Sequence, residues 1–455
     1  MSTPQATSKR PERGEQFEVR VESLAYGGNG VARTEHGYVV FVREGFPGDL
    51  VNVELVTRKK HYGEARVVEL LEPSPERIEP VAHHPGASWQ VLPYERQLEI
   101  KAQQVDDALR RIGHLDGYEL REIVPAVEQW RYRNKLEFSF GTGPAGELVC
   151  GFHAPGSWED IVGVHDCMLQ SERGNEARRA VLGWAQELGL SAYDRRDQRG
   201  LLRNLVIREG RRTGDLQVRL VITDGEHEPD FATLADVVAA DSLIVTRIAG
   251  GGETTAGGDS ELIDGGATIG EHLSGLDFRI GGEAFFQTNT EMAELLYGVA
   301  VDAAALQGWE RVYDLFCGIG TIGLVLAARA GEVWGVEIVE EAIADAISNA
   351  KANGIENAAF FAGDVRTTMR ELVEKAGRPD VLVVDPPRSG LSQKVVRRII
   401  EASPRRIVYV SCNPTTLAPN AAQLVEAGYA LKTVTPVDMF PQTPHIECVA
   451  LLERG

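Results

Sequence analysis

The chain has 455 residues, of which 43% are hydrophobic and 25% charged, a balance typical of a soluble globular protein with two or three domains. No apolar run is long enough to span a bilayer, the first residues lack the core of a secretory signal, and five scattered cysteines argue against a disulfide framework, so we expect a cytoplasmic protein. The net charge of −20 argues against nucleic acid as a partner, unless basic residues gather on one face.

Residues 14–72 show the sequence pattern of a small β-barrel. Apolar residues alternate with polar ones, and the segments "YGGNG" and "GFPGD" interrupt the alternation as turns do. Lys59 and Lys60 belong to a basic stretch near the end of this segment. Such a stretch is typical of a solvated hairpin and also of the basic edge of a nucleic-acid-binding barrel, so both interpretations stay open.

Residues 73–270 mix short strands and helices and form a predicted central mixed α/β domain. Apolar residues at helical spacing predict an amphipathic helix over residues 94–112. The segment "WRYRNKLEFSF" interleaves basic and aromatic side chains, which suits contact with RNA phosphates and bases, although a solvated strand face shows a similar pattern. If the chain binds RNA, we expect one basic face that gathers Lys59, Arg131, Arg133, Lys135 and Arg203.

Residues 271–455 follow a regular order of strands and helices from about residue 310 onward. Apolar segments such as "RVYDLF", "EVWGVEI", "DVLVVDPP" and "RIVYVSC" predict strands, and the segments between them predict helices. This alternation predicts a Rossmann-like α/β domain with a doubly wound parallel sheet. Ligands bind such sheets at the carboxyl ends of the strands, so the residues that follow each strand are the candidates for function.

The first of these strands runs into a glycine-rich turn, "DLFCGIGTIG". Gly318, Gly320 and Gly323 satisfy the G-x-G-x-x-G spacing, and Glu337 ends the next strand, where an acid binds ribose hydroxyls. Alone, this pattern permits NAD, FAD or S-adenosylmethionine (SAM). Asp314 on the first strand, together with later strand ends "DPP" and "SCNP" that hydride transfer does not need, favours SAM.

Two further acids follow later strands. Asp364 in "AGD" lies where a carboxylate commonly accepts the adenine amino group, and Asp385 in "VVDPPRSG" lies where a substrate enters beside the methyl group. An aromatic residue after Asp-Pro-Pro would indicate methylation of an amino group, with a flipped base stacked on the ring. Arg388 stands there instead, which favours methylation of another atom of the base.

Cys412 follows an apolar strand at the same edge, on a turn that the sequence Asn-Pro forces. Methylation of uracil carbon 5 needs a thiolate that adds to carbon 6 and a base that later removes the carbon 5 proton. Cys412 suits the first role, since a helix that starts nearby would favour its thiolate, although an inert buried thiol is the commoner fate of cysteine. Asp438, His445 and Glu447 in the closing segment are the candidates for the base, and burial would raise the pKa of Glu447.

The segments "FFQTNT", "DLFCGIGT", "GVE", "DPPRSG", "VYVSCNP" and "MFPQTPHIE" occur in this order, and together they resemble the bacterial RNA uracil-5-methyltransferases, which modify 23S ribosomal RNA or transfer RNA. The resemblance implies an N-terminal OB-like barrel, the TRAM domain, and a class I SAM methyltransferase domain. It also implies that Cys412 is the nucleophile, that Glu447 is the base, and that the 94–112 helix packs on the catalytic domain. The SAM and uracil pocket would be lined by Gln287, Phe316, Gly318, Gly320, Thr321, Glu337, Asp364 and Asp385.

The chain departs from this family at two points. Many members hold a [4Fe–4S] cluster through three closely spaced cysteines and a fourth further on, whereas the corresponding segment here, "VAHHPGASWQVLPYERQ", contains no cysteine. Only Cys167 matches the fourth ligand, and one thiolate cannot hold a cluster, so we expect no iron–sulfur cluster and no other metal. Thr321 replaces an asparagine often found beside the SAM carboxylate, and its hydroxyl can still donate a hydrogen bond.

The sequence therefore predicts a monomeric enzyme that uses SAM to methylate carbon 5 of a uridine in RNA, with 23S ribosomal RNA favoured over transfer RNA. The nearest alternative is an RNA 5-methylcytosine methyltransferase, but such enzymes typically carry a Pro-Cys pair where Asp385 is followed by two prolines here. A non-catalytic RNA-binding protein would leave Cys412 and Glu447 without a role. A small-molecule methyltransferase would not need the N-terminal domains.

Overall fold

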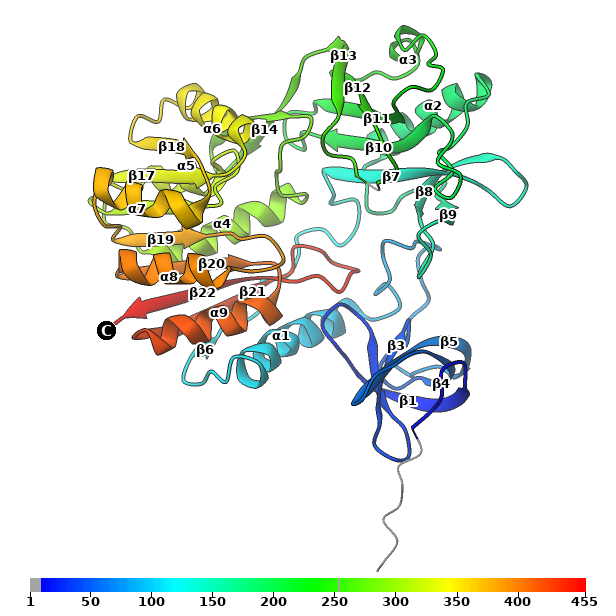
Figure 1. The fold of residues 1–455 in the computed structure, drawn as a ribbon, viewed down its shortest axis with the longest axis horizontal. Coiled ribbons are helices and arrows are strands. Elements are labelled where there is room, and N and C mark those ends of the chain that lie inside the picture. The colour runs from blue at the N-terminus through cyan, green and yellow to red at the C-terminus, as the bar shows by residue number, and fades with distance from the viewer. Residues whose placement is uncertain (1–9, 253) are drawn as a thin grey trace, which may run out of the picture.

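The computed structural model describes residues 10–252 and 254–455. It contains a small closed barrel, a seven-stranded sheet, an eight-stranded sheet and a two-stranded hairpin (Figure 1). The barrel (blue) lies beside the start of helix α1 (Tyr94–Arg111), and the two large sheets lie above it in the same view (Figure 1). No helix within the described ranges is long and apolar enough to cross a membrane.

The N-terminal barrel closes because its first and fourth strands pair, so that no strand edge stays open. Every second residue points inward, and Val40, Val42, Val51 and Val53 are at most 1% exposed. This alternation confirms the OB-like barrel that the sequence predicts. The strands are β1 (Gln16–Leu24), β2 (Gly30–Arg33), β3 (Val39–Arg43), β4 (Leu50–Arg58) and β5 (Tyr62–Glu72).

The seven-stranded sheet has the order β13-β12-β11-β10-β7-β8-β9. Helix α2 packs on it with an apolar face that includes Val181 and Trp184. Ser171 begins this helix, because its hydroxyl accepts a hydrogen bond from the Gly174 amide at 3.0 Å. The elements are β7 (Lys135–Thr142), β8 (Leu148–His153), β9 (Ile161–Gly163), α2 (Glu172–Glu187), β10 (Leu202–Glu209), β11 (Leu216–Thr223), α3 (Ala232–Ala235), β12 (Ser242–Ile248) and β13 (Asp259–Gly265).

The eight-stranded sheet has the order β18-β17-β16-β19-β20-β22-β21-β6. Strands β16 to β20 are parallel, and the winding direction reverses between β16 and β19, where doubly wound folds bind their ligands. Strand β22 runs antiparallel to β20 and β21 on either side. The predicted Rossmann-like domain is thereby confirmed. The strands are β6 (Glu119–Leu120), β16 (Arg311–Leu315), β17 (Glu332–Glu337), β18 (Ala358–Ala362), β19 (Val381–Val384), β20 (Arg406–Ser411), β21 (Tyr429–Val437) and β22 (Glu447–Arg454).

Helices cover both faces of this sheet. Successive strand residues face opposite layers, so that Val312 packs with α4, α5 and α6 while Tyr313 packs with α7, α8 and α9. The hairpin of β14 (Thr268–Leu273) and β15 (Leu276–Gly281) belongs to the first layer. The helices are α4 (Thr290–Ala304), α5 (Thr321–Ala327), α6 (Glu340–Ala352), α7 (Val365–Ala376), α8 (Gln393–Ala402) and α9 (Pro414–Glu426).

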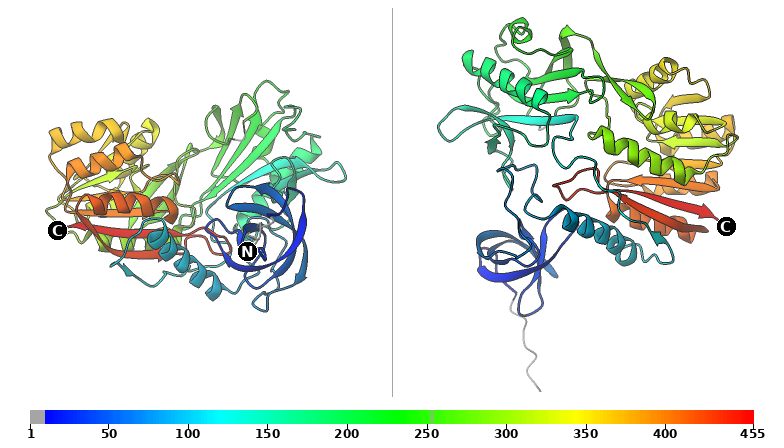
Figure 2. Two further views of the ribbon diagram at one scale, coloured as in Figure 1. Left: turned by 60° about the horizontal axis from the view of Figure 1, so that its bottom comes forward. Right: turned by 180° about the vertical axis from the view of Figure 1, so that it is seen from behind.

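Helix α1 joins the second layer although it precedes the rest of the eight-stranded sheet in the chain. Its residues Val105, Ala108 and Leu109 are buried in the same apolar cluster as α9, and both views of Figure 2 show α1 beside the C-terminal elements. Gln104, on the same helix, donates a hydrogen bond to the Leu24 carbonyl of the barrel at 3.0 Å. Strand β6 follows and pairs in parallel with β21. Helix α1 therefore contacts both the barrel and the helical layer of the eight-stranded sheet.

Candidate active site

The predicted nucleophile and base lie on adjacent strands. Strand β20 pairs with β22, and Ser411 lies opposite Cys448. Cys412 directly follows β20, and Glu447, which precedes Cys448, is the first residue of β22, so both lie at this end of the strand pair. After burial, the Glu447 carboxyl is the largest influence on the pKa of the Cys412 thiol, as expected of two groups that lie close together. The fold therefore brings this thiol and this carboxyl together.

Burial controls the ionisation of both side chains. Glu447 is 3% exposed, and this burial, reinforced by the Asp385 carboxyl, raises its pKa well above the usual value. Burial, followed by the Glu447 and Asp385 carboxyls, raises the pKa of the Cys412 thiol to about 12. Arg388 opposes both shifts because its positive charge favours the ionised forms. Burial therefore opposes the thiolate, and the effect of the nearby helix start on Cys412 stays a prediction.

The turn that carries Cys412 is held by Asn413. The side-chain oxygen of Asn413 accepts a hydrogen bond from the Thr415 amide at 3.0 Å and caps helix α9. Its side-chain nitrogen donates to the Arg388 carbonyl at 2.9 Å. The side-chain amide of Asn413 therefore joins the loop after β20 to the loop after β19. Asp385 begins the loop after β19, and burial raises its pKa to about 7. The two loops therefore form one wall of the site.

The turn after β16 has the backbone shape of a nucleotide-binding turn. Phe316, Gly318 and Gly320 have positive φ angles of 64°, 53° and 83°. A side chain at Gly320 would lie 3.0 Å from the Phe360 ring, so glycine is required there. Glu337 ends β17 and accepts a hydrogen bond from the Gly318 amide at 3.3 Å. The acid that is expected to bind the ribose therefore lies directly at the glycine turn.

A buried acid and an oriented hydroxyl lie beside this turn. Asp314 is 1% exposed, its Oδ2 accepts a hydrogen bond from the Gly323 amide at 2.8 Å, and its Oδ1 has no partner. Burial raises the pKa of Asp314 to about 8. The Tyr297 hydroxyl donates to the Thr321 hydroxyl at 3.2 Å, at the start of α5. A buried carboxyl with one unpaired oxygen next to a glycine cradle fits SAM, whose ammonium group and ribose hydroxyls are donors that the ionised carboxyl would accept.

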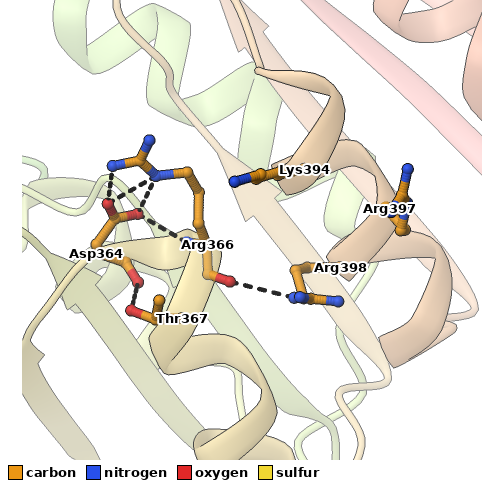
Figure 3. Close-up of a pocket in the computed structure, with 6 residues that line it drawn as sticks. All are labelled: Asp364, Arg366, Thr367, Lys394, Arg397 and Arg398. Atoms are coloured by element: carbon orange, nitrogen blue, oxygen red, sulfur yellow. Dashed lines mark hydrogen bonds and ion pairs between the residues drawn. The ribbon is translucent and has the colours of Figure 1, made fainter.

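Asp364, the predicted adenine contact, begins helix α7 and is paired with Arg366. Its Oδ1 accepts a hydrogen bond from the Arg366 amide at 2.8 Å, and its Oδ2 accepts one from the guanidinium at 2.7 Å. Figure 3 shows this pair at a pocket of about 280 Å³, which is also lined by Thr367, Lys394, Arg397 and Arg398. Arg366 therefore competes with adenine for the same carboxylate oxygens, and the adenine contact stays a prediction.

Gln287 lies in the segment between the β14–β15 hairpin and helix α4. It is 6% exposed, and its backbone carbonyl accepts a hydrogen bond from the Asn134 side chain at 2.9 Å. Asn134 directly precedes β7 of the central sheet and also donates to the Thr290 hydroxyl at 2.9 Å. Gln287 is thereby fixed where the domain of the seven-stranded sheet meets the domain of the eight-stranded sheet.

Ion pairs interrupt the basic face that the sequence predicts for RNA binding. Arg131 and Lys135 are half-buried, and each pairs with a carboxylate, at 2.8 Å and 2.7 Å respectively. The guanidinium of Arg133 lies 5.5 Å from the centre of the Phe440 ring, close to the segment that leads to the predicted base. Among these three cations, Arg133 is therefore the one that lies next to the candidate active site.

Arg203 does not belong to this face, and that expectation is wrong. Its side chain is buried, donates hydrogen bonds to two backbone carbonyls of the 250–252 loop and lies 4.0 Å from the centre of the Tyr193 ring. The loop covers a strand face that the sequence pattern alone assigns to solvent. Lys59 and Lys60 are exposed on the turn between β4 and β5. The barrel turn is therefore the clearest cationic feature among the predicted RNA contacts.

Sequence reasoning missed a buried ion pair that links helix α1 to the segment after β21. Lys101 of α1 and Asp438 after β21 are both fully buried, and the Lys101 ammonium donates to Oδ1 of Asp438 at 2.5 Å. The Tyr94 hydroxyl donates to the other oxygen at 2.9 Å. No local signal identifies this pair, because its partners lie far apart in the chain. Asp438 is thereby bonded to α1, which leaves Glu447 as the candidate base whose carboxyl acts on the pKa of Cys412.

Cys167, the residue that resembles the fourth ligand of the family's cluster, has a histidine as its neighbour. It is fully buried, and Nε2 of His84 lies 3.1 Å from its sulfur. Burial raises the pKa of the Cys167 thiol and lowers the pKa of His84 to about 4, so both groups are neutral. Across the described ranges, no group of three or more metal-binding side chains is found. The absence of a cluster stays a prediction.

Comparisons with known proteins identify the family. The model of the tRNA (uracil-5-)-methyltransferase family matches residues 224–455, and that of the TRAM domain matches residues 10–68. An "uncharacterized RNA methyltransferase" of Halalkalibacterium halodurans is 40% identical over 96% of this chain and 96% of its own length. Another, of Bacteroides thetaiotaomicron, is 39% identical over 94% of this chain and its entire length, 100%.

A solved structure of similar fold extends this comparison to the whole chain. The tRNA (uracil-54, C5)-methyltransferase of Pyrococcus abyssi, in complex with S-adenosyl-L-homocysteine, gives a TM-score of 0.78 at 29% identity. The match covers 96% of this chain and 100% of that one. With its TRAM barrel and its SAM-type glycine turn, the chain belongs to the tRNA (uracil-5-)-methyltransferase family and is a SAM-dependent RNA methyltransferase.

Proposed function

We propose that this protein methylates carbon 5 of a uridine in RNA through a covalent bond between Cys412 and carbon 6 of the uracil. The observation that carries the proposal is the pairing of β20 with β22, which brings Cys412, directly after β20, and Glu447, the first residue of β22, to the same end of the strand pair. Carbon 5 methylation requires a nucleophilic thiol and a base that act on the same ring. The SAM turn after β16 lies at the same edge, because β16 and β20 are parallel strands of one sheet.

The proposed reaction starts when Cys412 loses its proton and the thiolate adds to carbon 6 of a flipped uracil. Carbon 5 gains the electron pair and takes the methyl group from SAM, which leaves as S-adenosylhomocysteine. Glu447 then removes the carbon 5 proton, the 5,6 double bond re-forms, and the Cys412 thiolate is expelled. The net products are 5-methyluridine, S-adenosylhomocysteine and one proton. Arg388 assists both residues because its charge favours the thiolate and the carboxylate.

Glu447 is the best-placed base among the three candidates. Asp438 is held in its buried pair with Lys101. Burial and nearby cations lower the pKa of His445 to about 4, so this imidazole is a weak proton acceptor. Burial raises the pKa of Glu447, which makes its carboxylate a stronger proton acceptor than an ordinary glutamate.

Transfer RNA and 23S ribosomal RNA are the two candidate substrates. The Pyrococcus abyssi enzyme is a tRNA methyltransferase by name, so tRNA is the first RNA to test. Both RNAs imply action in the cytoplasm, and the site as described is complete within one chain, in keeping with a monomer. We propose that Lys59 and Lys60 contact phosphates on the barrel side and that Arg133 contacts RNA near the active site. Arg131 and Lys135 would contribute only if RNA displaces their carboxylate partners.

The first experiment identifies the modified nucleoside. Purified protein is incubated with methyl-tritiated SAM and with either total tRNA or 23S rRNA, and the digested nucleosides are separated and identified by mass spectrometry. We expect 5-methyluridine in one of the two RNAs. Formation of 5-methylcytidine, or no methylation of either RNA, would refute the proposal.

The second experiment tests the covalent mechanism. Cys412→Ala should abolish methylation, whereas Cys448→Ala, which removes the thiol opposite Ser411, should retain it. Glu447→Gln should accumulate an RNA–protein adduct that survives a denaturing gel, because the carbon 5 proton stays in place. Glu453→Gln, at the far end of β22, is the matched control and should accumulate no adduct. Methyl transfer by the Cys412→Ala protein would exclude the mechanism.

A further inference from the structure

The turn between β1 and β2 of the TRAM barrel reaches the catalytic sheet. Tyr26, in this turn, is partly buried and packs against the apolar cluster that α9 and β20 share. Its hydroxyl donates a hydrogen bond to the backbone carbonyl of Cys412 at 2.8 Å. These two residues are 386 positions apart in the chain, so the contact depends on how the barrel is docked. A residue of the RNA-binding barrel thus touches the peptide that carries the proposed nucleophile.

The turn is held in place from two sides. Gln104 of α1 donates hydrogen bonds to the Leu24 and Ala25 carbonyls at 3.0 Å and 3.1 Å. Gly28 has a φ of +92°, and a side chain there would lie 3.0 Å from Pro444. Pro444 belongs to the short segment that leads into β22, whose first residue is the proposed base. The turn therefore contacts both segments that carry the reacting side chains.

We propose that Tyr26 is a positioning residue that fixes the Cys412 turn, so that the thiol faces Glu447 only when the barrel is docked. This inference rests on the proposed function of Cys412 and Glu447. The residues that follow β20 leave the sheet, so the strand ladder no longer orients the Cys412 carbonyl. The Tyr26 hydroxyl supplies a donor at this point, in the way that rigid neighbours pre-organise a nucleophile.

The phenol is suited to this role because it remains a donor. Burial, and next the nearby Cys412 thiol, raise the pKa of Tyr26 to about 12. The hydroxyl therefore keeps its proton at any pH at which the protein would work. The barrel would then have two tasks: it binds RNA through its cations, and it completes the wall that orients the nucleophile.

The test compares Tyr26→Phe with Tyr429→Phe. Tyr429 also donates its hydroxyl to a backbone carbonyl, that of Pro404 at 2.9 Å, but at the opposite end of β20. Each variant is combined with Glu447→Gln, and the rate of adduct formation is measured on denaturing gels at saturating RNA and SAM. We expect Tyr26→Phe to slow adduct formation about tenfold. The dissociation constant for RNA should stay within about twofold of the parent value, because a misplaced nucleophile lowers the rate and not the affinity. Tyr429→Phe should match the parent.

A second readout does not depend on RNA chemistry. Cys412 is the partly exposed cysteine, whereas Cys150, Cys167, Cys317 and Cys448 are buried, so a small maleimide reports on the Cys412 turn by peptide mass spectrometry. Tyr26→Phe should change the alkylation rate of Cys412 about threefold or more by loosening the turn, at an unchanged melting temperature, and Tyr429→Phe should not. If the parent forms no adduct while this difference persists, the proposed function fails, and what stands is that Tyr26 fixes the Cys412 turn.

Two results would overturn the positioning role. The first is an adduct rate and an alkylation rate for Tyr26→Phe within about twofold of the parent. The second is a loss of activity that arises entirely from weaker RNA binding, with the rate at saturating RNA unchanged. Either result would mean that the barrel acts through RNA affinity alone.

Discussion

The buried ion pair between Lys101 and Asp438 gives a quantitative prediction for stability. Both side chains are fully buried, so Lys101→Met leaves the Asp438 carboxylate with Tyr94 as its remaining side-chain donor in the described structure. Breaking a buried pair by removing one partner costs about 3–5 kcal/mol of unfolding free energy. An unfolding entropy of about 2.1 cal/mol/K per residue gives about 1 kcal/mol per degree for 455 residues, so the melting temperature should fall by about 3–5 °C.

Intrinsic fluorescence during heating at neutral pH is the measurement, since the Trp89 ring lies 5.6 Å from the Lys101 ammonium and reports on this region. Lys351→Met on the exposed side of α6 is the matched control and should change the unfolding free energy by less than about 0.5 kcal/mol. Lys101→Met combined with Asp438→Asn should recover most of the loss, because no unpaired charge then remains. This reasoning would be refuted if Lys101→Met had the melting temperature of the wild type. It would also be refuted if the double variant melted at no higher temperature than Lys101→Met.

Four further predictions concern the site. Methylation at saturating substrates should rise with pH through the raised pKa of Glu447, and Arg388→Gln should move this rise to higher pH, because the guanidinium lowers that pKa. Burial raises the pKa of Asp314 from 3.8 to about 8, so the folded protein keeps a proton that the unfolded chain loses. The melting temperature should therefore fall as the pH rises from about 4 to 8, and Asp314→Asn should flatten that slope. Gly320→Ala should weaken SAM binding measured by calorimetry, because its φ of 83° costs an alanine about 1–2 kcal/mol. Iron analysis of anaerobically purified protein should find no iron–sulfur cluster, and about four irons per chain would contradict the prediction.

The alternation of strands and helices in the last third of the chain was sufficient to predict the catalytic sheet. The strand ends at Asp385 and Cys412 follow from buried apolar runs that stop at proline-containing turns, and both residues lie directly after a strand in the structure. The barrel was equally predictable, because its inward-facing valines alternate strictly. Local periodicity of this kind depends on neighbours in the chain, which a sequence displays directly.

Contacts between distant segments were not predictable. Arg203 is an arginine in a strand, and nothing near it in the sequence shows that the 250–252 loop covers it. The pairing of Lys101 with Asp438 and the contact of Tyr26 with Cys412 arise only after the domains have docked. The depth at which Cys412 is buried, which raises the pKa of its thiol, was not predictable either, although the helix start beside it is visible in the sequence.

The position of α1 and β6 in the catalytic sheet also limits how the polypeptide can be divided. Val105 and Leu109 cover apolar residues of α9 and the sheet, and β6 pairs with β21 from the C-terminal part of the chain. A shortened protein that starts at residue 271 would lack both elements and expose that apolar surface and a strand edge to water. The sheet is complete only when β6 pairs with β21, which closes a loop of about three hundred residues, and closing such a long loop is slow. Refolding from denaturant should therefore end with the docking of α1 and β6.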